Sequence, residues 1–215
     1  MKKILNICLL AILVSCQTAP SYNSTNIGVG KDPQLPEPSI SFIPTVNIAR
    51  ASSWPEGIKP QVKDGFIITE YSRELTHPRW LYVLPNGDIL VAQSNKQPPK
   101  KTKGLKDLVA GYIMKRAGAG VDSPDKITLL RDKNGDGTKV LASDFLKNLH
   151  SPFGMALIGN DLYVANTDAI LRFHYEPGYT VIDTKKYPPE KIVDLPEGDI
   201  NYHWTKNIIA SSDGT

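Results

Sequence analysis

Histidine is the side chain best suited to proton transfer near neutral pH, and its placement in this chain follows a repeated pattern. Three of the four histidines, His77, His150 and His203, each come just before a segment with the pattern of a β-strand. A neutral imidazole in such a place can accept a proton from a substrate hydroxyl. It can equally cap nearby backbone groups, a role without chemistry. A metal site made of all three imidazoles is a further alternative.

The segments that begin at these histidines are copies of one unit. HSPFGMALIGNDLYVANTDAILRF (150–173) has the pattern strand, turn, strand, strand, and HPRWLYVLPNGDILVAQS (77–94) carries the same pattern earlier. The unit begins again in HWTKNIIASSDGT (203–215). Apolar runs on both sides of an Asn-Gly or Gly-Asn-Asp turn predict antiparallel hairpins. A recurring unit of four short antiparallel strands is typical of the blades of a β-propeller.

The expected strands are short and rich in apolar, β-branched and aromatic residues. They are Phe66–Tyr71, Arg79–Leu84, Ile89–Gln93, Lys126–Arg131, Lys139–Phe145, Phe153–Ile158, Asp161–Asn166, Ala169–His174 and Lys191–Leu195. These strands predict an all-β fold, a partial propeller with about two blades and the first strand of a third. Because the innermost strands line the channel of a propeller, the three histidines are expected at one rim of that channel.

Two segments between strands have alternative interpretations. Residues 96–120 start with a basic stretch and continue with apolar residues at helical spacing, which predicts a helical insertion. Its apolar stripe either packs against the sheets, or belongs to a basic amphipathic element at a membrane surface or over a site. DKNGDG (132–137) resembles the start of a calcium loop, but Ser143 stands where that loop needs a glutamate. Strands flank it, so we predict a hairpin turn.

The N-terminus predicts export and a lipid anchor. Two lysines precede a mostly apolar stretch, Ile4–Val14, that is too short to span a bilayer as a stable anchor. The stretch ends in LVSC, which resembles the bacterial lipobox, so residues 1–15 are expected to be a signal peptide and Cys16 the lipidated residue. Gln17 in place of an aspartate indicates sorting to the outer membrane, facing the periplasm. Cys16 would then be the only cysteine left, and no disulfide could form within the chain.

Composition predicts a turn-rich globular protein with an N-terminal tether. Of the 215 residues 40% are hydrophobic and 22% charged, with 16 Gly and 17 Pro. The formal net charge is +3, and without Lys2 and Lys3 it is +1, so no nucleic-acid partner is indicated. Residues 16–62 are polar and expected to be a lipidated flexible tether. The expected partial propeller covers residues 63–215, as 63–149 with the insertion 96–120, then 150–199, then 200–215.

The chain resembles a known family in four stretches. They are PRWLYVLPNGDILVAQS, IMKRAGAG with KITLLRDKNGDG, SPFGMALIGNDLYVANTDAILRF, and INYHWTKNIIASSDGT. They resemble the glucose/sorbosone dehydrogenase family, and within it the sorbosone dehydrogenase branch, over about residues 65–215. The resemblance implies the N-terminal fragment of a six-bladed β-propeller that binds pyrroloquinoline quinone (PQQ) with calcium. It implies oxidation of a sugar at its anomeric or aldehyde carbon by hydride transfer to the quinone.

The same resemblance implies which residue is catalytic. By its position at the start of the third copy, His203 matches the family's catalytic histidine, which takes the hydroxyl proton. Tyr202 stands where the glucose-oxidising branch has a carboxylate, and Asp199 lies four positions before His203. The residues that hold the quinone and calcium in that branch come mostly from later blades. A fragment without those blades is therefore expected to be inactive alone.

Other function classes stay open at this stage. A propeller of this kind can be a non-catalytic module that binds a protein or a glycan on the same face. A propeller hydrolase would need carboxylate metal ligands at the rim, and the sequence indicates no such cluster. The expected partners are therefore a small-molecule sugar and, through the lipid, a membrane. The electron acceptor is not indicated.

Overall fold

The computed structural model describes residues 28–33, 48–97, 104–138, 140–198, 203–211 and 213. The chain divides into two compact units, Met1–Ile48 and Ala49–Thr215, and the helix and strands named below belong to the second. Cys16, Asp199 and Tyr202 lie outside the described residues, so the expectations for them stay predictions. In the described part of the chain, no helix has the length and apolar character needed to cross a membrane.

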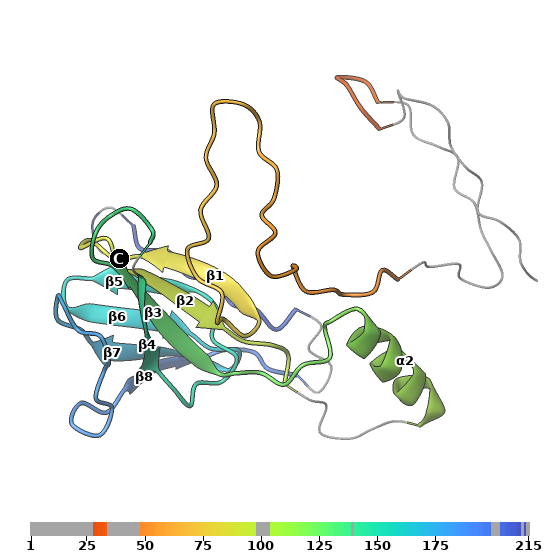
Figure 1. Ribbon diagram of the computed structural model, residues 1–215. Coiled ribbons are helices and arrows are strands. Elements are labelled where there is room, and N and C mark those ends of the chain that lie inside the picture. Colours follow the sequence, from red (N-terminus) through yellow and green to blue (C-terminus); the bar gives the residue numbers. More distant parts are fainter. Residues whose placement is uncertain are drawn as a thin grey trace, which may run out of the picture. The chain divides into compact units, whose positions relative to one another are not determined.

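In the described residues, eight strands form two antiparallel sheets of four strands, and each sheet follows the order of the chain (Figure 1). The first sheet contains β1 (Pro78–Val83), β2 (Ile89–Gln93), β3 (Lys126–Asp132) and β4 (Val140–Leu146). The second contains β5 (Met155–Ile158), β6 (Asp161–Ala165), β7 (Ala169–His174) and β8 (Glu190–Asp194). The predicted all-β protein with a repeated four-strand unit is confirmed at this level. The two sheets of the described residues form no closed barrel or propeller.

One predicted strand is wrong. Residues 66–71 form a loop, and the side chains of Phe66 and Ile67 are 71% and 95% exposed. Composition favours a strand only where a neighbouring edge and a buried face are available, and this segment has neither. The described part of the third copy, residues 203–211, also contains no strand.

One apolar core joins the two sheets. The central strand β2 is buried on both of its faces, from Leu90 to Gln93. The core side chains are Leu84, Leu90, Ala92, Ile127, Leu129, Phe145, Leu146, Leu149, Met155, Leu162, Val164, Phe173, Tyr175 and Ile182. Direct hydrogen bonds also cross between the sheets, since the Leu157 amide donates to Tyr82 Oη at 2.9 Å. The two copies of the unit therefore fold as one body.

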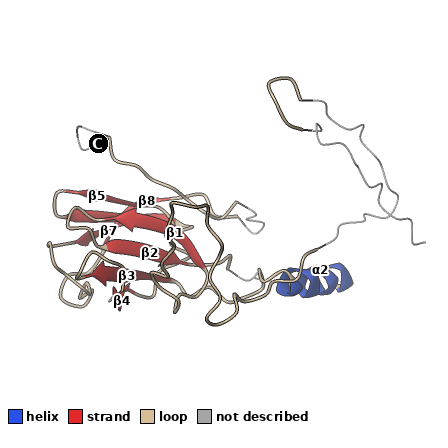
Figure 2. Cartoon of the chain, turned by 45° about the horizontal axis from the view of Figure 1, so that its top comes forward, coloured by secondary structure: helices blue, strands red, loops and turns tan. Residues whose placement is uncertain are grey.

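The predicted helix is present, but its predicted packing is wrong. Helix α2 runs from Leu105 to Arg116, and Figures 1 and 2 both draw it outside the strands. Leu108, Val109 and Tyr112 are 65%, 53% and 69% exposed. The stripe therefore does not pack against the sheets.

A close approach of backbone to Gly154 attaches the third copy to the second sheet. The Gly154 amide donates to the Lys206 carbonyl at 3.0 Å. A Cβ at Gly154 would lie 2.6 Å from the Ile208 nitrogen and 2.7 Å from the Asn207 Cα. Since backbone atoms cannot move aside as a flexible side chain can, only glycine fits here.

We therefore predict that Gly154→Ala lowers the free energy of unfolding by about 1–3 kcal/mol through overpacking. Chemical denaturation of the two proteins measures this difference. Gly111→Ala is the matched control, because Gly111 lies in α2 with open space around its Cα. It should be neutral or stabilising by up to about 1 kcal/mol. Equal effects of the two changes would contradict the packing described.

Candidate metal centre

One hydrogen bond recurs between successive copies of the unit. A hydroxyl residue follows the second strand of each copy, Ser94 in the first and Thr167 in the second, each seventeen residues after the copy's histidine. Ser94 Oγ donates to the Pro152 carbonyl at 2.6 Å, and Thr167 Oγ1 donates to the Trp204 carbonyl at 2.9 Å. Each copy thus fixes the first residues of the next one. These hydrogen bonds therefore also hold the segments that begin with His150 and His203.

The segment that carries His150 is held on both sides. Leu149 donates its amide to the Asp125 carbonyl at 3.0 Å, and the Ser151 amide donates to Asp125 Oδ1 at 2.8 Å. The Thr167 amide donates to the His150 carbonyl at 3.0 Å. Asn148 and Ser151 have φ angles of 55° and 46°, a region that side chains other than glycine seldom occupy. Such local strain is often found around functional residues.

The imidazole of His150 meets two carboxylates. Its Nδ1 lies 3.1 Å from Asp168 Oδ2 and 3.6 Å from Glu197 Oε2. One ligand atom from each of these residues lies within 4.8 Å of the other two, and we call the three residues the His150 cluster. Asp168 follows Thr167 in the turn before β7, and Glu197 follows β8. Residues far apart in the chain therefore meet beside the histidine segment.

One carboxylate oxygen in the His150 cluster has no hydrogen-bond partner among the described residues. It is Oδ1, the second carboxylate oxygen of Asp168, and it is buried. Buried acceptors are normally paired, so such an atom calls for an explanation, for example an ion. The three side chains remain 29–44% exposed, which leaves the cluster open to solvent. A small cation from solution can therefore reach it.

The ligand atoms of the His150 cluster indicate which metal ions it can bind. Imidazole nitrogen with carboxylate oxygen suits Zn²⁺ or another divalent transition metal, and three protein ligands leave a position open for a further one. Two negative charges facing one imidazole are also stabilised by a cation between them. A divalent transition metal is therefore the ion that this geometry fits.

Sequence reasoning missed the cluster, although a signal existed. Asp168 lies eighteen residues after His150, and the residue at the same distance from His77 is Asn95. Asn95 instead donates its side-chain amide to the Ala119 and Val121 carbonyls at 3.0 and 2.6 Å. The two copies therefore differ at one carboxylate. A comparison of the copies position by position would have singled out Asp168.

The three predicted histidines do not share a metal site among the described residues. His77 Nδ1 lies 2.6 Å from the Ser94 carbonyl oxygen, which confirms the capping role for this residue. His203 is exposed, and neither histidine belongs to the group of candidate ligands found in the described part of the chain. The fourth histidine, His174, lies 3.1 Å from Glu176, and its ring centroid lies 5.1 Å from that of Tyr187.

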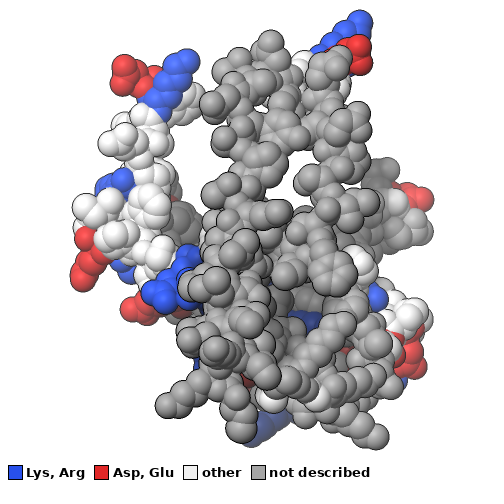
Figure 3. Space-filling model, turned by 90° about the vertical axis from the view of Figure 1, so that its right-hand side faces the viewer, with Lys and Arg blue, Asp and Glu red and all other residues white. Residues whose placement is uncertain are grey.

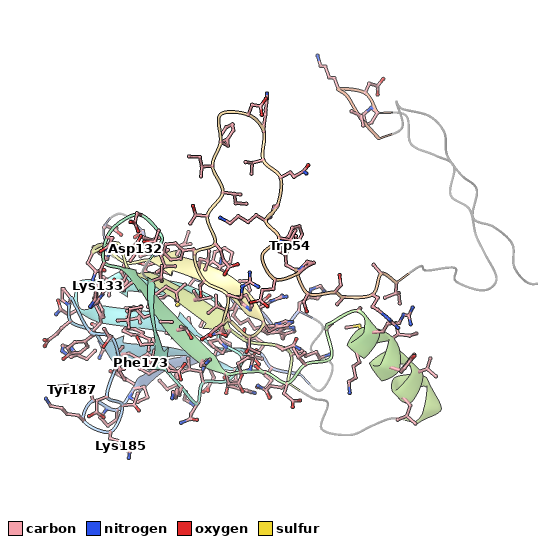
Figure 4. All side chains as sticks on the ribbon, in the orientation of Figure 1. Trp54, Asp132, Lys133, Phe173, Lys185 and Tyr187 are labelled. Atoms are coloured by element: carbon pink, nitrogen blue, oxygen red, sulfur yellow. The ribbon has the colours of Figure 1, made fainter. Side chains whose placement is uncertain are left out.

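The DKNGDG segment is a hairpin turn, as predicted. Asp132, labelled in Figure 4, ends β3. Its Oδ1 accepts the amides of Asn134 and Gly135 at 3.1 and 3.0 Å, and its Oδ2 accepts that of Gly137 at 2.7 Å. The backbone of the turn thus satisfies both carboxylate oxygens.

One exposed aromatic ring lies just after a histidine at the start of a copy of the unit. Trp80 of β1 packs on Phe153, with ring centroids 5.1 Å apart, and 39% of its surface stays exposed. The neighbouring Arg79 guanidinium lies 5.3 Å from the ring of Trp204. All four residues follow a copy's histidine by one to three positions. The starts of the three copies therefore lie side by side, and Trp80 is the exposed ring among them.

Basic and acidic side chains occur together on one face of the molecule. On the face drawn in Figure 3, basic side chains in blue and acidic ones in red are interspersed among the described residues. The most buried ion pair among the described residues is Arg131 with Asp88, at 2.8 and 2.6 Å. The hydrogen bond from Arg131 holds the pKa of the Asp88 carboxyl below its usual value.

Neither cofactor implied by the resemblance fits the His150 cluster. Calcium prefers about six to eight oxygen ligands, whereas an imidazole nitrogen lies at the centre of this group. PQQ is an anionic quinone and would need cationic partners here. The contacts of His150 are instead to two carboxylates. The geometry therefore gives neither group a part in a reaction at this site.

Comparisons with known proteins name no family for the chain. No family model matches, and no curated protein matches. Two solved structures do, described as the iodide and the calcium structure of Trichoderma reesei Carbohydrate-Active Enzymes Family AA12. Identity is 17% in both, with TM-scores of 0.46 and 0.41 over 72% and 66% of this chain. The chain spans about a third of their length, 32% and 28%.

These comparisons correct the expected family. The assignment to the glucose/sorbosone dehydrogenase family is wrong, because neither a family model nor a curated relative supports it and the matching structures carry another description. Likenesses with TM-scores below 0.5 and identity below 25% establish no activity. The function has to be argued from the His150 cluster itself.

Proposed function

We propose that this chain is a metal-dependent binding module, in which a divalent transition metal bound by the His150 cluster takes up hydroxyl groups of a glycan. The observation that carries the proposal is the convergence of one imidazole and two carboxylates, with ligand atoms within 4.8 Å of one another. Three protein ligands leave coordination positions open, and neighbouring sugar hydroxyls are oxygen donors able to fill them.

The exposed ring of Trp80, beside the histidine segments, supports a glycan as the ligand. Trp80 is partly exposed and rests on Phe153, three residues after His150. An indole offers an apolar face to the C–H side of a sugar ring, and its N–H remains a hydrogen-bond donor. A metal that takes hydroxyls and a ring that takes the apolar face together discriminate a sugar from a simple anion.

For the architecture, we propose that the two sheets are blades of a β-propeller. Support comes from the recurring hydrogen bond, in which Ser94 and Thr167 each donate to the beginning of the next copy. Repetition of one such step is how propellers are built. In that arrangement, the His150 cluster lies at the rim where the inner strands begin.

The full chain, after metal removal and with or without added Zn²⁺, tests the function on a panel of immobilised glycans. Retention on at least one glycan should require Zn²⁺ and should be lost in Trp80→Ala. Glycan retention that persists after chelation would remove the metal from the function. Zinc binding without any glycan retention would leave a metal site and remove the glycan.

The cellular location and the predicted chemistry at His203 need separate tests. We propose a lipid on Cys16 and an outer-membrane location facing the periplasm. After a wash at about 1 M salt, which screens contacts between charges, the starting protein should stay in the membrane fraction and the Cys16→Ser protein should be released. Oxidation of a sugar with His203 as proton acceptor stays a prediction, as do its cofactors. His203 is exposed.

A further inference from the structure

Helix α2 exposes an apolar stripe that the sheets leave uncovered. Tyr112 lies three positions after Val109 and four after Leu108, so its side chain neighbours both of them on one side of the helix. Leu108, Val109 and Tyr112 are 65%, 53% and 69% exposed. Apolar groups that gather on one side of a surface helix usually have a partner.

The same side of the helix ends in a cluster of cations. Arg50, Tyr112, Lys115 and Arg116 line a shallow depression of about 230 Å³. The Ala51 amide donates to the Arg116 carbonyl at 3.2 Å, which holds the Arg50 segment against the end of α2. Among the described residues, no carboxylate forms an ion pair with any of these three cations. The depression is therefore suited to an anion.

The sequence around the helix carries the same charge. From Lys96 to Arg116 there are seven basic residues and a single acidic one, Asp107. Basic residues near an anionic bilayer each add to its attraction, and apolar side chains on the same face enter the boundary between headgroups and acyl chains. An acidic protein is the alternative partner for these cations, and the vesicle experiment below separates it from a lipid surface.

We propose that α2 docks on an anionic phospholipid bilayer. Lys115, Arg116 and Arg50 hold lipid phosphates, and Leu108, Val109 and Tyr112 enter the interface. The docking is independent of the metal centre, since it uses residues of another part of the fold. It is also separate from lipidation of Cys16, because the contact is made by side chains.

Vesicle sedimentation of the full chain tests this docking, in a Cys16→Ser background that carries no lipid on that sulfur. The protein should bind vesicles of phosphatidylethanolamine with phosphatidylglycerol. Binding should be much weaker when phosphatidylcholine replaces the phosphatidylglycerol, or at about 1 M salt, where charges are screened within about 3 Å. Equal binding to both kinds of vesicle would overturn the proposal.

A matched pair of variants locates the contact. Leu108→Glu should lower the vesicle affinity about tenfold or more, because it places a charge in the interface. Ala110→Glu adds the same charge roughly opposite Leu108 and Tyr112, at 3.6 residues per turn, and should change affinity less than about threefold. Equal losses would contradict docking through this face. Vesicle binding that neither variant weakens would also contradict the proposal, because another segment of the protein would then contact the lipid.

Hydrogen exchange of the starting protein tests the docking without any substitution. It therefore remains a test even if a variant alters the helix. In the starting protein, amides of residues 105–116 should exchange more slowly when anionic vesicles are present. Exchange that the vesicles leave unchanged would also overturn the proposal.

Discussion

Asp88→Ala is expected to lower the free energy of unfolding by about 3–5 kcal/mol, the cost of breaking a buried ion pair by removing one partner. The Asp88 side chain is 4% exposed and that of Arg131 is 23% exposed. Arg131 donates from Nε and Nη2 to the two carboxylate oxygens, and Nη2 also donates to the Gly178 carbonyl at 3.2 Å. The pair joins a turn of the first sheet to a loop of the second. Urea denaturation of both proteins measures the difference.

An exposed ion pair in the same molecule is the control. Glu190 pairs with Arg172, and their side chains are 58% and 37% exposed. Glu190→Ala should therefore cost no more than about 1 kcal/mol. If Glu190→Ala and Asp88→Ala cost the same, the Asp88 pair would not join the sheets as described.

Acid should remove the contribution of Asp88 in a defined direction. Its pKa is lowered in the folded protein, chiefly by the hydrogen bond from Arg131. The stabilisation is then fully present above the unfolded-state value, about 3.9. It is lost as the pH falls through the folded-state value. The stability difference between the starting protein and Asp88→Asn should accordingly shrink below about pH 4. A difference that grows on acidification would contradict this.

The largest effect on binding is expected at the metal centre. His150→Ala should weaken Zn²⁺ binding by about 100-fold or more, because loss of a direct ligand exceeds the 10–100-fold effects of its supporting partners. Asp168→Asn copies the residue that the first unit has at this position, Asn95, and should have an effect of similar size. Calorimetric titration of Zn²⁺ measures both. All proteins compared should also carry Cys8→Ser and Cys16→Ser, because free thiolates bind zinc as well.

The control uses the other histidine that contacts a carboxylate. His174 lies 3.1 Å from Glu176. Among the described residues, it does not belong to a group of three candidate metal ligands. His174→Ala should leave the affinity unchanged within about twofold, although it also removes an imidazole from the surface. Equal losses in the two alanine variants would indicate non-specific binding by surface histidines.

Local sequence patterns were sufficient for most strands. Alternation and the Asn-Gly and Gly-Asn-Asp turns located all eight observed strands to within two residues at each end, because those signals act over a few residues. The strand expected at residues 66–71 failed for lack of a neighbouring edge, which composition does not encode. The packing of α2 failed for a similar reason. Helical spacing tells which residues share a side, but not what covers them.

Local sequence patterns could not predict the candidate site, because its three ligands come from three separate segments of the chain. His150 was singled out by its position before a strand, yet its partners follow β6 and β8. Only the pairing of the strands brings Asp168 and Glu197 to the same end of the sheet. The histidine repeat pointed to His77, His150 and His203 alike, and the resemblance implied a catalytic role for His203 alone.

The most direct test of the metal centre is the zinc X-ray absorption spectrum of the full chain loaded with an equimolar amount of Zn²⁺. The account predicts scattering from one imidazole, with a Zn–N distance of about 2.0–2.1 Å, together with carboxylate oxygens at about 2.0–2.2 Å. The imidazole signal should disappear in His150→Ala and persist in His174→Ala. A spectrum with sulfur at about 2.3 Å, or one that His150→Ala leaves unchanged, would contradict it.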